Sequence, residues 1–104
     1  MVYIISVNKD DVVRIVCRKT NYRASVIEDV INETLDSIIA YMEDGITVRF
    51  SGFGVFEPKQ RAARIGRNPH SGEPVPIPAR TVPVFRPGEN MKKAVIKEDK
   101  ENNL

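Results

Sequence analysis

Hydrophobic positions recur at helical spacing through the N-terminal half of the chain. After Ser25, apolar residues follow alternating steps of three and four, which predicts a long amphipathic helix. The stripe consists of Ile27, Val30, Ile31, Thr34, Leu35, Ile38, Ile39 and Met42. Ser25 and Glu28 have the spacing of a capping box near its start, although the helix could begin a couple of residues earlier, and Gly45 is a stop signal. The stripe is long for a chain with one other sizeable helix, so we infer that part of it packs on another subunit.

Shorter helices are expected on either side of this stripe. Asn8 can cap a helix that starts at Lys9, has two acids in its first turn and ends near Thr20-Asn21. Pro87-Gly88 breaks the chain before a short helix over residues 89–95.

The hydrophobic period changes from 3.6 to 2 after Gly45. Residues 46–50 alternate between apolar and polar, Ser51-Gly52 has the composition of a two-residue hairpin turn, and residues 53–56 follow as a second strand. The apolar side chains of this hairpin can cover the helices.

Residues 57–86 contain few large apolar side chains, so they cannot pack a core on both faces. A turn is expected over Gly66–Gly72, between a basic run and the proline-rich run Pro74–Arg80. This arrangement predicts a long two-stranded ribbon that projects from the rest of the fold.

The proline spacing favours an antiparallel ribbon over its rival, a polyproline II segment. Prolines 74, 76 and 78 share one parity, so they remove hydrogen-bond donors from one edge only. The ladder can then use Val75, Ile77 and Ala79. Pro83 has the opposite parity, so the pairing phase is expected to shift, or the ladder to end, between Pro78 and Pro83.

Charge is distributed unevenly along the 104 residues. The chain has 16 Lys and Arg against 14 Asp and Glu, a net charge of +2. Residues 1–48 hold five basic and eight acidic side chains, whereas residues 49–93 hold nine basic and three acidic ones. A surface that binds a polyanion is therefore expected in the second half. A solvated basic face is the alternative, and charge alone does not separate DNA from RNA or from an acidic protein.

The residues offer little for catalysis. His70 lies on a glycine-containing turn without a carboxylate or thiol at a motif spacing, and Cys17 is most simply a small buried hydrophobe. Phosphate-loop and dinucleotide motifs are absent, and a single cysteine excludes an internal disulfide. We expect no enzyme activity, metal, cofactor, small-molecule substrate or membrane span, and a cytoplasmic location.

A basic two-stranded ribbon has the dimensions of a DNA groove, and its cations can neutralise phosphates. Pro69, at the expected tip, has two interpretations. Its rigid ring can wedge between base pairs, or it can serve turn formation alone.

The segment Gly52–Gly72, which contains Gly-Arg-Asn-Pro, resembles the signature of the bacterial HU and integration host factor family. So do Ile77-Pro-Ala, Val82-Pro-Val-Phe and Arg86-Pro-Gly, and the resemblance extends over about residues 8–95. It implies an α+β fold with two N-terminal helices, a three-stranded sheet with a long ribbon arm, and a short C-terminal helix. Two chains are expected to intertwine as a homodimer, or as a heterodimer with a paralogue.

The resemblance also implies one domain over residues 1–104. An N-terminal extension covers residues 1–7, and the dimer body covers 8–56 and 84–95. The DNA-binding arm covers 57–83, and residues 96–104 form a flexible tail. Prolines 58, 74 and 76 make this arm richer in proline than is common in the family.

Site residues follow from the same resemblance. Pro69 matches the family's intercalating proline. The residues expected to bind DNA are Lys9, Lys59, Arg61, Arg64, Arg67, Asn68, Arg80, Arg86, Lys92 and Lys93. The residues expected in the dimer core are Ile31, Leu35, Ile38, Phe50, Phe53, Phe56 and Phe85.

The implied function is histone-like. Two arms would enter the minor groove of double-stranded DNA with low sequence specificity, insert the proline, and bend and condense the DNA of the nucleoid. Members of this family are themselves established examples of such minor-groove wedges, so the mechanism is inherited from the resemblance. One alternative is a site-specific subunit of the integration host factor type. A more remote one is an RNA-binding or protein-interaction module.

Overall fold

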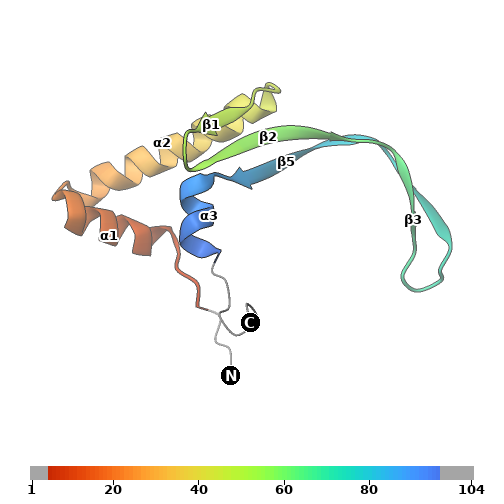
Figure 1. Ribbon diagram of the computed structural model, residues 1–104, viewed down its shortest axis with the longest axis horizontal. Coiled ribbons are helices and arrows are strands. Elements are labelled where there is room, and N and C mark those ends of the chain that lie inside the picture. The colour runs from red at the N-terminus through yellow and green to blue at the C-terminus, as the bar shows by residue number, and fades with distance from the viewer. Residues whose placement is uncertain (1–4, 97–104) are drawn as a thin grey trace, which may run out of the picture. The chain divides into compact units, whose positions relative to one another are not determined.

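The computed structural model describes residues 5–96, which form three helices and five strands (Figure 1). The elements are α1 (Lys9–Thr20), α2 (Ala24–Glu43), β1 (Val48–Phe50), β2 (Gly54–Arg61), β3 (Arg64–Arg67), β4 (Pro74–Ile77), β5 (Arg80–Pro87) and α3 (Glu89–Val95). They divide into two compact units, Met1–Ile39 and Ala40–Leu104. The expectations for residues 1–4 and for the tail from 97 onward lie outside the described residues. No helix within the described ranges is long and apolar enough to span a bilayer.

Helix α1 begins and ends where the sequence predicts. The Asn8 side chain accepts from the Asp11 N–H at 3.0 Å, and the Asp11 carboxylate accepts from the Asn8 N–H at 2.9 Å. This reciprocal cap satisfies two backbone donors that a helix start leaves unpaired. Asn21 ends the helix with φ +62, and its N–H donates to the Cys17 carbonyl. Val13 is the buried residue of the helix.

Helix α2 begins at Ala24, two residues before Val26, where a cap at Ser25 would start it. This agrees with the expected allowance for an earlier start, but Ser25 lies inside the first turn and is not the cap that its spacing from Glu28 indicated. The predicted end is confirmed, since Gly45 has φ +78 and donates to the Met42 carbonyl at 3.0 Å. Thr34, the polar member of the stripe, donates its hydroxyl to the Val30 carbonyl at 2.7 Å. That bond satisfies the hydroxyl within the helix.

The three-stranded sheet has the antiparallel order β1-β2-β5. Its first turn has three residues, Ser51 to Phe53, because Phe50 pairs directly with Gly54. The two-residue turn predicted there is wrong. The Phe53 N–H donates to the Phe50 carbonyl at 2.9 Å, and Gly52 adopts φ +82, which a residue with a side chain rarely adopts.

An aromatic cluster lies on the sheet. Phe56 and Phe85 are cross-strand partners with ring centroids 4.8 Å apart, and Phe53 lies 5.9 Å from Phe85. Phe50 contacts Phe56 edge-on at 6.1 Å. Gly54 is required beside them, because a Cβ there would overlap the Phe85 ring. The cluster joins all three strands.

Strands β2 and β5 extend away from α3 into the ribbon of β3 and β4, which confirms the long arm (Figure 1). Residues 74–77 pair with β3, so they form a ladder and not a polyproline II helix. The ladder stops after Ile77 and resumes at Arg80, close to the predicted interruption. Ala79 falls in this break, so its predicted place in the ladder is wrong.

The cross-strand register explains the break. Pro58 lies opposite Pro83, and Pro76 lies opposite Ile65. Proline has no backbone N–H, so each proline must occupy a position from which no hydrogen bond is donated to the partner strand. Pro76 and Pro83 have opposite parity and cannot both do so in an uninterrupted ladder. The break between the two ladders resolves this conflict.

Helix α3 starts after Pro87-Gly88 and covers Glu89–Val95, as predicted. Its start is tied to the first sheet turn, because Gly88 N–H donates to the Phe53 carbonyl at 2.7 Å and Asn90 N–H donates to the Gly52 carbonyl at 3.0 Å. These bonds fix the helix that carries Lys92 and Lys93.

Candidate nucleic-acid interface

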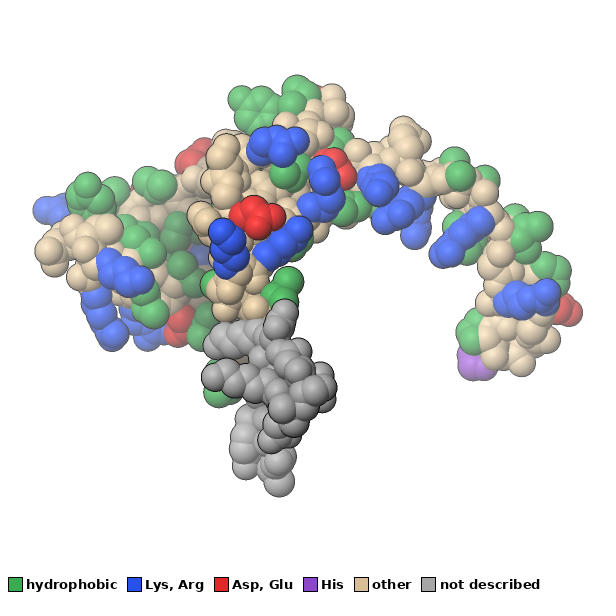
Figure 2. Space-filling model, viewed as in Figure 1, with side chains coloured by type: hydrophobic (Ala, Val, Ile, Leu, Met, Phe, Trp, Pro, Cys, Tyr) green, Lys and Arg blue, Asp and Glu red, His purple; other side chains and the backbone are tan. Residues whose placement is uncertain are grey.

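The arm presents its cations to solvent. Lys59, Arg61, Arg64, Arg67 and Arg80 are all exposed, and Figure 2 shows blue side chains along β2, β5 and the ribbon beyond them. None of the five forms an ion pair within residues 5–96. Their positive charge is therefore not neutralised by the described part of the fold. The arm can attract a polyanion over its whole length.

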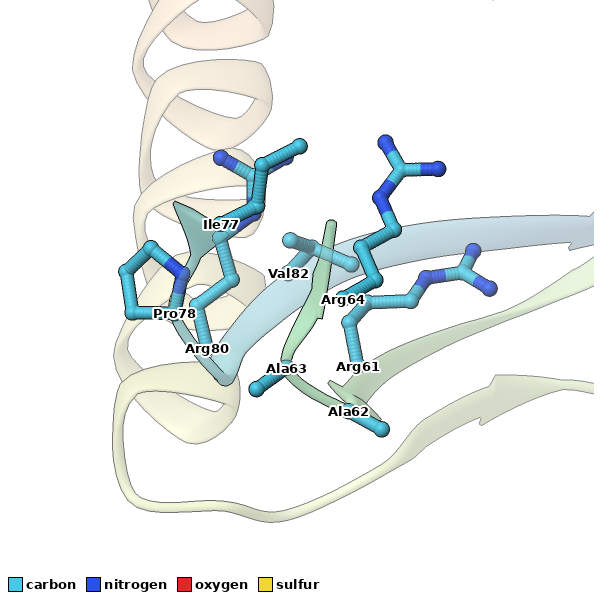
Figure 3. A pocket seen from close by; sticks show the side chains of 8 residues that line it. All are labelled: Arg61, Ala62, Ala63, Arg64, Ile77, Pro78, Arg80 and Val82. Carbon is cyan, nitrogen blue, oxygen red and sulfur yellow. The ribbon is translucent and has the colours of Figure 1, made fainter. Parts of the chain in front are cut away.

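Three of these arginines, Arg61, Arg64 and Arg80, line one hollow at the break in the ladder (Figure 3). The hollow has a volume of about 640 Å³. Its lining consists of Arg61, Ala62, Ala63, Arg64, Ile77, Pro78, Arg80 and Val82. Alanine, proline and branched side chains contribute the apolar part of this lining, and the guanidinium groups supply its charge. The hollow therefore combines van der Waals surface with hydrogen-bond donors suited to phosphate.

Arg61 and Arg64 line the same hollow because the ladder is broken between them. Residues an odd number apart point to opposite faces of a regular strand. In Figure 3 the two side chains extend toward the same side of the break. The sequence pattern identified both residues as basic arm positions but did not show that they converge.

The tip of the arm is a tight loop organised by Asn68. Its side-chain oxygen accepts from the His70 N–H at 2.8 Å, and its backbone exchanges hydrogen bonds with Gly72 and Glu73. The loop between β3 and β4 therefore starts after Arg67. The turn predicted over Gly66–Gly72 begins later than expected, because Gly66 and Arg67 belong to strand β3. Asn68 shapes the loop that exposes Pro69.

Arg67 supports the same loop. Its Nη1 donates to the Gly72 carbonyl at 3.0 Å, which leaves the other guanidinium donors available. Gly72 has φ +73, so the loop closes through a left-handed glycine. Pro69 thus projects from a loop tied together by several hydrogen bonds and not from a loose end.

Two of the predicted DNA-binding cations outside the arm, Lys9 and Arg86, contact polar or acidic side chains. Lys9 donates to Asn32 Oδ1 at 2.9 Å and lies 3.7 Å from Glu28. Arg86 contacts Glu57 through two nitrogen–oxygen pairs. Lys92 and Lys93 on α3 are exposed. Glu57 was not identified as a functional residue from the sequence. The signal that could have found it is its position two residues before the arm cation Lys59, which places both on the same face of one strand.

The residues predicted for a dimer core are unevenly covered in a single chain. Ile38 is buried, and Ile31 and Phe56 are half-buried. Leu35 remains 49% exposed and Phe53 48% exposed, and Phe50 and Phe85 are exposed as well. Exposed apolar side chains in such number mark an interaction surface.

The residues considered for catalysis do not assemble into a site. The Cys17 thiol is half-buried and donates to the Tyr22 carbonyl at 3.1 Å, so it is less buried than predicted. His70 is exposed at the tip of the arm. Across residues 5–96, no three His, Cys, Asp or Glu side chains gather where they could hold a metal ion.

Comparisons with known proteins agree with this geometry. A family model described as bacterial DNA-binding protein matches residues 7–96. The DNA-binding protein HU of Buchnera aphidicola is 40% identical over 88 residues, which cover 85% of this chain and 96% of that protein. HU 1 of Bacillus subtilis is 35% identical, with 85% and 96% of the two chains covered. The chain is also similar to the protein in an Anabaena HU–DNA cocrystal structure, with a TM-score of 0.77 and 36% identity over 86% of this chain and 98% of that one.

Proposed function

We propose that this chain, which belongs to the HU family of bacterial DNA-binding proteins, acts as a dimer that binds duplex DNA and bends it without strong sequence preference. The observation that carries this function is the arm, a ribbon of exposed cations ending in a braced loop that presents Pro69. Residues 57–83 act as the arm, and residues 8–56 and 84–95 act as the body.

The arm cations supply most of the affinity. Lys59, Arg61, Arg64, Arg67 and Arg80 neutralise backbone phosphates, and each neutralised phosphate adds roughly −0.9 to the slope of log affinity against log salt. The hollow lined by Arg61, Arg64 and Arg80 offers several guanidinium donors to the DNA backbone at the break in the ladder. Such contacts are independent of base sequence.

Pro69 supplies the bend. Its ring enters the minor groove at a base step, where unstacking costs a few kcal/mol in the family's own established cases. Asn68 contributes by holding the loop that points the ring outward. The extra phosphate contacts that a bent duplex makes offset the cost. Lys9, Arg86, Lys92 and Lys93 meet the flanking phosphates from the body.

Dimerisation completes the core that one chain leaves open. Leu35 and the exposed phenylalanines are covered when two chains combine. Two arms then reach the same duplex. The protein acts by binding alone, with no chemical step and no cofactor, on chromosomal DNA in the bacterial nucleoid.

The test compares intact with nicked duplexes across a range of salt concentrations. The wild-type protein should bind both, bend both, and prefer the nicked duplex because less unstacking is required. Pro69→Ala should still bind but bend less. Unchanged bending by this variant would remove the wedge role.

Competitor nucleic acids separate the alternatives. Random DNA should compete within about tenfold of any chosen site, whereas site-specific proteins usually exceed 10³. Equal affinity for duplex RNA would contradict a ribbon shaped for the minor groove of DNA, because the A-form minor groove is wide and shallow.

A further inference from the structure

Glu57 and Arg86 form a two-point ion pair across strands β2 and β5. Arg86 Nε lies 3.1 Å from Glu57 Oε1, and Arg86 Nη2 donates to Glu57 Oε2 at 3.2 Å. Glu57 pairs with Val84 and Arg86 pairs with Val55, so the two charged residues are diagonal neighbours on one face of the ladder. Parallel, two-point contacts of this kind are the strongest geometry for an arginine and a carboxylate.

Burial makes the two partners unequal. The Glu57 side chain is 23% exposed, whereas that of Arg86 is 56% exposed. The carboxylate is the more shielded partner, and the guanidinium remains accessible from solvent. A ligand with its own negative charge can therefore approach Arg86.

The register places this pair within a row of cations. Because side chains alternate along a strand, those of residues 55, 57, 59 and 61 share one face of the ladder with their partners on β5. That face carries Arg86, Lys59, Arg61 and Arg80, and Glu57 is the acid among them. Lys59, Arg61 and Arg80 form no ion pair in the described part of the chain. Glu57 thus neutralises one cation, Arg86, of a row whose other cations are unpaired within the described residues.

We infer that Glu57 is an internal competitor for Arg86, which DNA must displace before Arg86 can contact a phosphate. The inference rests on the proposed function. In the free protein the Glu57 carboxylate pairs with the Arg86 guanidinium. In the complex a phosphate oxygen of the DNA takes the place of that carboxylate. The freed carboxylate then takes up one cation from solution. Glu57 therefore lowers both the affinity for DNA and the net number of counterions released.

Glu57→Gln tests this with little change of shape, because the amide is nearly isosteric with the carboxylate. Affinity for a labelled mixed-sequence duplex is measured by fluorescence anisotropy at several salt concentrations. The variant should bind about threefold to tenfold more tightly at low salt, and its salt slope should be steeper by up to about 0.9. Glu57→Asp, which is too short to keep both contacts, should fall between the variant and the wild type.

Two controls isolate the competition. Glu43→Gln removes the same charge from the exposed end of α2, where no ion pair forms within the described residues, and should change affinity less. In an Arg86→Gln background, Glu57→Gln should lose most of its effect, since the group it releases is gone. Thermal melting of every variant verifies folding, and Glu57→Asp serves if Glu57→Gln does not fold.

The outcomes separate this inference from the proposed function. Absence of DNA binding by the wild type would overturn the proposed function itself. Wild-type binding together with an unchanged or weaker Glu57→Gln variant would overturn only the competition. An equal gain from Glu43→Gln, or an undiminished gain in the Arg86→Gln background, would do the same.

Discussion

In the body, Lys9, Arg14 and Arg86 each contact a carboxylate, whereas within residues 5–96 none of the five arm cations does. The body also holds the four-phenylalanine cluster and the buried hydrophobic side chains of the described residues, Val13, Ile27, Ile38 and Val55. The arm has no comparable core; Ile65, for example, is 75% exposed.

This difference shows how one small chain separates apolar packing from its unpaired cations. Packing in the body stabilises the fold, so substitutions of its apolar side chains act on folding and assembly, whereas exposed ion pairs contribute little to stability. The arm is held by its ladder and its tip loop, so its charges are available to a ligand without first breaking an ion pair within the described residues. The Glu57–Arg86 pair lies where the two regions join, and it has features of both.

The largest effect is expected from breaking the body's apolar surface with Leu35→Glu. An unpaired charge buried at a subunit interface costs about 3–5 kcal/mol, so the dimer should dissociate and DNA binding should be lost with it. Sedimentation velocity and a band-shift assay measure the two losses. Ala40→Glu adds the same charge on the opposite side of α2, where the residue is exposed, and should leave both intact. A dimeric Leu35→Glu protein would contradict the assigned interface.

Pro69→Ala should affect the arm alone. Without the rigid ring the duplex stays stacked, so bending should fall and affinity for intact DNA should drop about tenfold to a hundredfold. Thermal stability should not change, because Pro69 lies in an exposed loop. Fluorescence energy transfer between duplex ends reports the bend. Pro76→Ala, in the same arm but away from the tip, is the matched control, and an equal loss of bending there would remove the special role of the tip.

Arg64→Ala should reduce the salt slope by about 0.9, since one phosphate contact is lost. Affinity should fall by a similar factor for every duplex sequence, because the contact is with the backbone. Anisotropy titrations at several salt concentrations provide both values. Arg49→Ala removes an exposed cation from β1, in the body, and should leave the slope unchanged. A sequence-dependent loss in Arg64→Ala would indicate base contacts.

The smallest effects are expected from substituting two asparagines, one in the body and one at the tip of the arm. Asn8→Ala removes the reciprocal cap of α1 and should lower the free energy of unfolding by about 1 kcal/mol, with DNA binding retained. Asn68→Ala removes the oxygen that accepts from His70 N–H and should weaken bending with little change in stability. Chemical denaturation and the bending assay distinguish them. The reverse pattern would invalidate the division between body and arm.

The sequence by itself determined the features that depend on near neighbours. The Asn8 cap, the Gly45 stop and the helix over residues 89–95 follow from local periodicity and capping, which a few adjacent residues decide. The signature around Gly-Arg-Asn-Pro was enough to identify the family. The proline parities also predicted an interruption of the ladder between Pro78 and Pro83, and the break lies at the first end of that interval, at residues 78–79.

Only the tertiary structure decided which distant residues meet. The three-residue turn at Phe53, the hollow that Arg61 and Arg64 share, and the contact of Glu57 with Arg86 all depend on cross-strand register. A shift of one residue in that register would send each side chain to the opposite face. Composition and spacing along one strand do not contain this information, because the partner strand and the break in its ladder set it.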